Sequence, residues 1–183
     1  MKGLFCICLL LSSTLVQSQN EISYSDLLKR TREISIHDSF YVDVESVEHT
    51  LLDTNALKLF FYLIYPPLTT TNDSPMEYFI SGKITVHPNF DMLLVTTRKK
   101  IEDKSLFEHV YLITSRKDGS NINTLGVAMR RIGGNNVNAS AWLHKDFKVF
   151  VTTRINNIKG KEIGGLTEYR INEDGRFVHY PHW

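Results

Sequence analysis

The stretch that decides the expected fold is Leu57-Lys58-Leu59-Phe60-Phe61-Tyr62-Leu63-Ile64-Tyr65, which is closed by Pro66-Pro67. It is short and aromatic, and Asp53-Thr54-Asn55 precedes it, a pattern that favours a strand over a helix. Both alternating faces are apolar except at Lys58. We therefore expect a central strand covered on both faces, in which each large side chain contributes about 1.5–3 kcal/mol when buried.

The chain opens with a pattern typical of a secretory signal peptide. Met1-Lys2 gives a basic start, Gly3 to Val16 is apolar, and Val16-Gln17-Ser18 supplies small or medium residues for cleavage. The apolar run is shorter than a membrane-spanning helix requires. We expect residues 1–18 to be removed and residues 19–183 to form a single secreted, extracellular β-domain.

Removal of this segment leaves a neutral chain without cysteine. Both cysteines, Cys6 and Cys8, lie within residues 1–18, and the loss of Lys2 leaves 20 basic and 20 acidic side chains. We expect a monomer without disulfides that depends on its own hydrophobic core in an oxidising compartment. A net charge of zero argues against nucleic-acid or membrane partners.

The rest of the chain is dominated by alternation with a period of two residues. One short amphipathic helix is expected over Asp26 to Glu33, with Ser25 or Asp26 as its N-cap. Its inner side is expected to carry Tyr24, Leu27, Leu28 and Thr31. Beyond the central stretch, the expected strands are 40–44, 78–86, 92–98, 107–114, 125–129, 139–143, 147–155, 166–171 and 176–180. Glycine, asparagine and aspartate turns separate them. The pattern predicts an all-β antiparallel meander, either a closed barrel with a short N-terminal helix or a two-sheet sandwich.

The sequence contains one internal repetition. Val95-Thr96-Thr97-Arg98 recurs as Val151-Thr152-Thr153-Arg154, and Asp118-Gly119 recurs as Asp174-Gly175, both after 56 residues (151 − 95 and 174 − 118). A duplicated hairpin unit is one explanation. The other is coincidence, because Val-Thr-Thr is common in strands and Asp-Gly is common in turns.

The motifs that mark well-known active sites are missing from the sequence. It has no His-Glu-x-x-His, Gly-x-Ser-x-Gly or glycine-rich phosphate loop, and the processed chain has no thiol. We expect no catalytic residues, metal or cofactor, and therefore a protein that is not an enzyme.

A ligand site is expected from aromatic side chains and two arginines. If the sheet closes into a barrel, some of its aromatic residues line a cavity, and an arginine at its mouth meets a charged group. The candidates are Tyr62, Phe79, Phe107, Tyr111, Phe150, Arg98 and Arg154. Asn72-Asp73-Ser74 and Asn138-Ala139-Ser140 are sequons, so Asn72 and Asn138 are expected glycosylation sites.

A signal peptide, a short helix and then a meander from Tyr24 to Tyr180 resemble the plan of the lipocalins, above all the divergent secreted lipocalins of arthropods. Ser39-Phe40-Tyr41-Val42 stands where the first barrel strand would begin, although the hallmark Gly-x-Trp is absent. The resemblance implies a carrier or scavenger that binds a small apolar or amphipathic ligand in a barrel. The alternative is a secreted, non-enzymatic module, such as a sandwich, that binds an extracellular protein through its loops.

Overall fold

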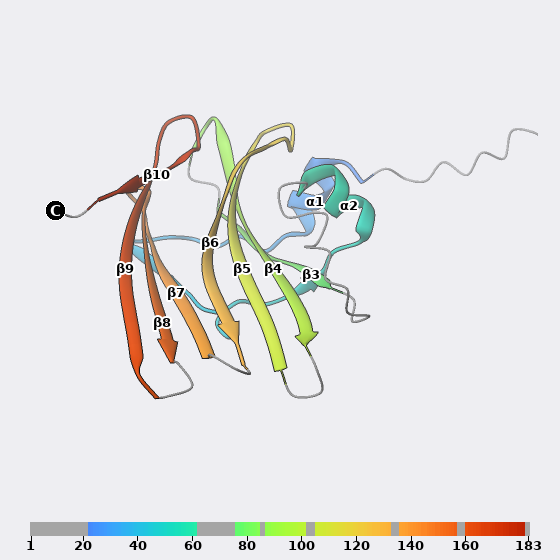
Figure 1. The fold of residues 1–183 in the computed structure, drawn as a ribbon. Coiled ribbons are helices and arrows are strands. Elements are labelled where there is room, and N and C mark those ends of the chain that lie inside the picture. Colours follow the sequence, from blue (N-terminus) through green and yellow to red (C-terminus); the bar gives the residue numbers. More distant parts are fainter. Residues whose placement is uncertain are drawn as a thin grey trace, which may run out of the picture.

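The structure is a computed structural model, and it describes residues 22–61, 76–84, 87–101, 105–132, 136–156 and 160–181. Two short helices and ten strands follow one another along the chain (Figure 1). The elements are α1 (Tyr24–Arg30), β1 (Ser39–Val42), β2 (Thr50–Leu51), α2 (Thr54–Phe60), β3 (Glu77–Ile84), β4 (Phe90–Ile101), β5 (Ser105–Arg116), β6 (Asn121–Arg131), β7 (Asn136–His144), β8 (Lys148–Asn156), β9 (Glu162–Ile171) and β10 (Phe177–Tyr180).

The strands form an antiparallel sheet, which confirms the all-β, antiparallel part of the predicted fold. Its order is β10-β9-β8-β7-β6-β5-β4-β3-β2, and β1 pairs with β7 off this path. Within the described residues the two ends of this order, β2 and β10, are not joined by strand pairing, so the sheet is not closed. Residues 129–131 of β6 pair with the first half of β7, and β1 pairs with the second half. Strands β6 and β7 therefore diverge after these residues, and β1 pairs with the part of β7 that β6 does not reach.

The prediction of a central strand at residues 57–65 is wrong for the part that the structure describes. Leu57 to Phe60 belong to helix α2, and residues 62–65 lie outside the described residues. The side chain of Asp53 caps this helix by accepting hydrogen bonds from the amides of Asn55 (2.7 Å) and Ala56 (2.9 Å). The apolar residues follow a helical period, because Leu57 and Phe61 are buried while Leu59 is exposed.

Helix α1 lies close to its predicted position but begins two residues earlier. Ser23 caps it through a hydrogen bond from the amide of Asp26 (3.1 Å), where Ser25 or Asp26 was the expected cap. Tyr24 and Leu27 form its buried side, as predicted.

The strand that is covered on both faces is β4. Every residue from Phe90 to Thr97 is buried. One face of β4 contributes Leu93 and Val95 to a cluster with α1 and α2, which we call the helix-side core. In Figure 1 both helices lie beside β3 and β4, away from β8 and β9. Helix α2, which contains half of the stretch expected to be central, is thus part of the cover over the central strand.

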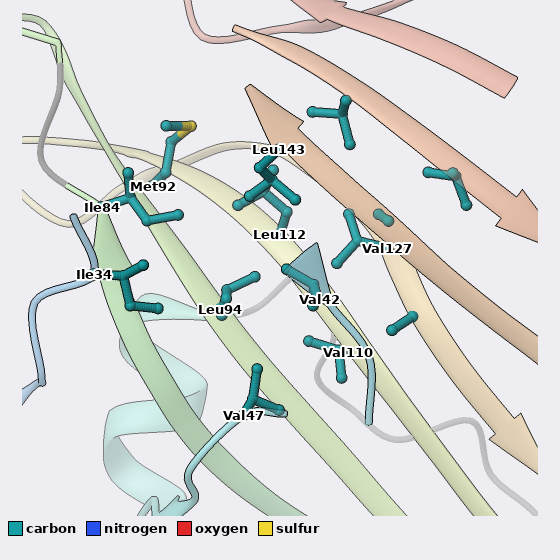
Figure 2. Packing of buried hydrophobic residues seen from close by; sticks show 14 of the residues in the cluster. Ile34, Val42, Val47, Ile84, Met92, Leu94, Val110, Leu112, Val127 and Leu143 are labelled. Atoms are coloured by element: carbon teal, nitrogen blue, oxygen red, sulfur yellow. The ribbon is translucent and has the colours of Figure 1, made fainter. Parts of the chain in front are cut away.

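The opposite face of β4 points into a larger cluster, which we call the inner core. Figure 2 shows Met92 and Leu94 of β4 gathered with Val42 of β1 and Leu143 of β7. The inner core also takes Val149 from β8, so it joins side chains of β3–β6 to side chains of β1 and β7–β9. Gly82 lets Ile34 pack closely at its border, since a Cβ there would lie 2.4 Å from Cδ1 of Ile34 and would displace that side chain.

The 56-residue repetition has a structural counterpart. Val95 pairs with Tyr111 between β4 and β5, and the positions 56 residues later, Val151 and Thr167, pair between β8 and β9. Ser115–Asn121 and Ile171–Phe177 correspond in the same way between the following strands. The two units nevertheless bury different faces, because Val95 lies in the helix-side core and its counterpart Val151 lies in the inner core.

Candidate functional site

The predicted ligand-binding aromatics lie on three different surfaces. Tyr111 packs against the helix-side core, and Phe107 shares its face of β5, because the two positions alternate with buried Val110 and Glu108. Phe79 lies under the guanidinium of Arg98, 5.1 Å from its carbon. Phe150 stands on the outer face of β8, and Tyr62 lies outside the described residues.

The two predicted arginines belong to one polar row that crosses the sheet. The register pairs Arg98 with Glu108, Glu108 with Arg130, Arg130 with Asn138 and Asn138 with Arg154. Residues paired in this way point to the same side of their two strands. The row therefore carries alternating charge on β4–β6 and ends in an amide and an arginine on β7 and β8.

A buried carboxylate organises the first part of this row. The side chain of Glu108 is 2% exposed, and its Oε1 accepts a hydrogen bond from Nε of Arg98 at 2.6 Å. Its Oε2 accepts from Nη2 (2.5 Å) and Nε (3.1 Å) of Arg130. Nη1 of Arg130 also donates to Glu45 at 2.5 Å. Arg98 and Arg130 therefore both neutralise Glu108.

Electrostatics within the row fix the charge of Arg130. Burial by itself lowers the pKa of this guanidinium, but the hydrogen bonds and the charges of Glu108 and Glu45 outweigh burial and raise it. The pKa of nearby His49 is lowered, first by burial and then by the charge of Arg98. This part of the row is an internal salt-bridge network whose two arginines already have anionic partners.

Arg154 differs from the other two arginines. Its side chain is 66% exposed, and its contact with Glu162 is long, at 3.9 Å. It lines a groove of about 450 Å³ at the place where β6 and β7 diverge. Trp142, Tyr41, Ser140 and Thr152 line the same groove. Arg154 is thus a cation of the groove whose contact with an acidic side chain is long, and it shares the groove with the rings of Tyr41 and Trp142.

The groove borders an aromatic sheet face. A second row of paired residues runs from Tyr41 through Trp142, Phe150 and Glu168 to Tyr180. Arg170 lies on this face too, since its guanidinium is 4.0 Å from the centre of the Tyr180 ring and its Nε donates to Glu168 at 3.1 Å. The large apolar side chains that stand exposed here are Tyr41 (38%), Trp142 (46%), Leu166 (61%), Val178 (49%) and Tyr180 (46%). We call these five residues together with Phe150 the aromatic face.

The aromatic face is the outer side of the sheet half whose inner side builds the inner core. Ala141 and Leu143 of β7 point inward, so Trp142 between them points outward. The ring of Tyr41 lies 5.0 Å from the ring of Trp142. On the other half of the sheet, α1 and α2 cover the corresponding surface. Among the described residues, no helix packs in this way on the aromatic face.

Sequence reasoning named Phe150, Arg154 and Asn138 but missed Tyr41 and Trp142 as members of one surface. The alternation Ser140-Ala141-Trp142-Leu143 was the available signal, because it places a large aromatic residue opposite an apolar face. Asn138 is exposed and lines the groove, whereas Asn72 lies outside the described residues.

Comparison of the chain with protein-family models, with curated proteins and with solved structures found no significant match. The lipocalin resemblance therefore stays a prediction. Within the described part of the chain, no helix is both long enough and apolar enough to cross a membrane. In the same residues, no three histidine, cysteine, aspartate or glutamate side chains are grouped to hold a metal ion.

Proposed function

We propose that the protein is an extracellular, non-catalytic binding module whose partner is another protein. The observation that carries this proposal is the aromatic face, where five large apolar side chains are 38–61% exposed on one side of the sheet. Contiguous exposed apolar surface on a soluble protein is typical of a protein-binding site. The contact surface is then a sheet face, and not the loops named in the alternative that the sequence left open.

The composition of the aromatic face supports a protein partner. Tyrosine, tryptophan and arginine are the residues that dominate the energetics of protein interfaces. Arg170 and Arg154 border Tyr180 and Trp142 on this face, so a partner with an apolar centre and acidic groups near it has complementary chemistry. For the fold we infer two packed layers, the sandwich alternative, because a filled inner core separates β3–β6 from β7–β9.

The test compares Leu166 with Leu59, which are both exposed leucines but lie on β9 and α2. A photo-crosslinking residue is placed at each position, and the protein is exposed to the fluid into which it is secreted. We expect a protein adduct from position 166 and none from position 59. Binding of that partner should be at least tenfold weaker for Leu166→Asp and unchanged for Leu59→Asp. Equal crosslinking or equal binding loss at both positions would refute the proposal.

A second function, binding of a small amphipathic anion, is supported by the groove. Its volume of about 450 Å³ is in the range of small-molecule sites, and it combines the Tyr41 and Trp142 rings with the Arg154 guanidinium. This places the predicted carrier function in an open groove on the outside of the sheet. Among the described residues, Arg154 is the one predicted ligand residue that lines this groove.

This second function is tested with a naphthalene sulfonate dye, which has an aromatic and an anionic part. Trp142 and Trp183 are the only tryptophans, so Trp183→Phe leaves Trp142 as a single reporter. We expect saturable quenching that Arg154→Gln weakens about tenfold and that fatty acids or steroids reverse. Arg32→Gln is the control, since Arg32 is also exposed but does not line the groove and pairs with Glu48. Quenching that does not saturate would exclude the groove as a ligand site.

A further inference from the structure

We infer that Asn138 carries an N-linked glycan whose first sugars lie over the groove and cover the Tyr41–Trp142 end of the aromatic face. The sequence alone supplies a sequon at this position. The fold adds the surroundings of the asparagine, and these determine where the sugars go.

Asn138, Ser140 and Trp142 alternate along β7, so their side chains share one side of the strand. All three line the groove. At about 3.3 Å per residue, Trp142 lies roughly 13 Å along the strand from Asn138. That distance is within reach of the first two sugars of a glycan that follows the strand. The side chain of Asn138 is exposed, so the folded protein has room for the attachment.

The surroundings favour sugars that lie along the groove. On either side of Asn138 the paired residues are Arg130, whose charge is already matched by Glu108 and Glu45, and the exposed Arg154. The hydroxyl-bearing residues Ser140 and Thr152 line the floor toward Trp142. Hydroxyl and amide groups of a sugar find hydrogen-bonding partners in such a lining, and its C–H face packs on exposed aromatic rings. The glycan would also shield Trp142 and Tyr41 from association with other molecules.

The covalent step uses a lipid diphosphate-linked oligosaccharide as the donor. The amide nitrogen Nδ2 of Asn138 forms a bond to the anomeric carbon of the first sugar. The bond from that carbon to the diphosphate oxygen breaks, so the lipid diphosphate leaves with the electron pair, and Nδ2 loses one proton.

The glycan would divide the aromatic face into two parts. Its sugars would cover Tyr41 and Trp142, and they would leave Leu166, Val178 and Tyr180 free for a protein. This consequence rests on the proposed function, whereas attachment and shielding of Trp142 do not. A glycan in the groove would also compete with a small ligand there.

Attachment is tested on protein secreted by eukaryotic cells and carrying Asn72→Gln, which removes the other sequon. We expect an intact mass above that of the polypeptide, and a fall to the polypeptide mass after enzymatic removal of N-glycans. Asn138→Gln and Ser140→Ala should both abolish the added mass, whereas Ser140→Thr keeps the sequon and should retain it. A secreted protein with the bare polypeptide mass would overturn the inference.

Shielding is tested by acrylamide quenching of Trp142 in a Trp183→Phe background. We expect the quenching constant to rise at least twofold when the glycan is removed by enzyme or by Ser140→Ala, with circular dichroism confirming an unchanged fold. A reporter created by Leu166→Trp in a Trp142→Phe background should show no change. Equal quenching of Trp142 with and without the glycan would show that the sugars point away. Neither measurement involves a partner, so both can succeed if the proposed function fails.

Discussion

Glu108 shows how one residue determines what its neighbours can do. A buried carboxylate is costly unless it is paired, and Arg98 and Arg130 supply that pairing from the two adjacent strands. Their charges are therefore engaged in the fold. Arg154, which occupies the same row on β8, contacts the exposed carboxylate of Glu162 only at 3.9 Å and stays exposed. Position in the row, rather than residue type, distinguishes a structural arginine from a candidate binding arginine.

We predict that Glu108→Gln lowers the free energy of unfolding by up to about 3–5 kcal/mol, because it leaves two partly buried guanidinium groups without their counter-charge. Glu162→Gln is the matched control. Its contact with Arg154 is long and solvent-exposed, so a loss under about 1 kcal/mol is expected. Urea denaturation measures both. A loss as small for Glu108→Gln as for the control would contradict the role given to this network.

His109 gives the protein a dependence on pH. It lies 4.1 Å from Tyr111 between ring centres, and burial lowers its pKa to about 4. In the unfolded chain the pKa is about 6.5. The folded state therefore favours neutral histidine, and the corresponding stability is present above pH 6.5 and is lost as the pH falls toward 4.

The full loss from His109 is of the order of 3 kcal/mol. We predict that His109→Phe removes this part of the difference between unfolding free energies at pH 7 and pH 4.5. His37→Phe, a change at an exposed histidine, should preserve the difference measured for the unchanged protein. If both variants keep the same pH dependence, His109 is not buried in its neutral form.

At the scale of elements, substitutions in and beside α2 distinguish the observed helix from the strand that the sequence predicted. Phe61 is fully buried at the end of α2, whereas Leu59 points to solvent. We predict a loss of about 3–5 kcal/mol for Phe61→Ala. For Leu59→Ala we predict a loss below about 1 kcal/mol. A strand with the predicted alternation would place Leu59 and Phe61 on one face, so similar losses at both positions would argue for that strand and against the helix.

The elements that sequence reasoning located best are the strands after residue 76, because turns and period-two alternation act locally and agree there. It failed at residues 54–61. Asp53 is a helix cap that resembles a loop residue, and the five apolar residues that follow are too closely spaced to distinguish a strand period from a helix period. The site was found only in part. Asn138, Phe150 and Arg154 were named, but local patterns do not tell which sheet face the helices will cover. That choice depends on contacts between α1 and β4, which are distant in sequence.

The repetition also belongs to this scale. The turns 116–120 and 172–176 have the same hydrogen bonds, from Gly119 to Arg116 and from Gly175 to Asn172, both at 2.9 Å. Together with the matching registers of the flanking strands, this supports duplication of a three-stranded unit over coincidence. The face of the second unit that corresponds to the helix-covered face of the first, marked by Val151, points into the inner core instead.

At the scale of the whole molecule, the two helices cover only one part of the sheet. This asymmetry predicts that local stability differs from strand to strand. β4 is paired on both edges and buried on both faces, so its amides should open only when the whole domain unfolds. β10 has four residues, pairs only with β9, and is exposed at Val178 and Tyr180. Its amides should exchange through local opening.

We predict that hydrogen exchange is slowest in β4 and β5 and at least a hundredfold faster in β10. Phe61→Ala should lower the protection of Leu94 and Val95 by the free energy that denaturation measures, because these amides report global unfolding. The same substitution should leave the exchange of Val178 and Tyr180 unchanged, since local opening of an edge does not involve the helix-side core. If β10 proves as protected as β4 and responds equally to Phe61→Ala, then β10 has a further strand partner. The sheet would in that case be closed, and the barrel with its internal ligand cavity would become the better account of the fold.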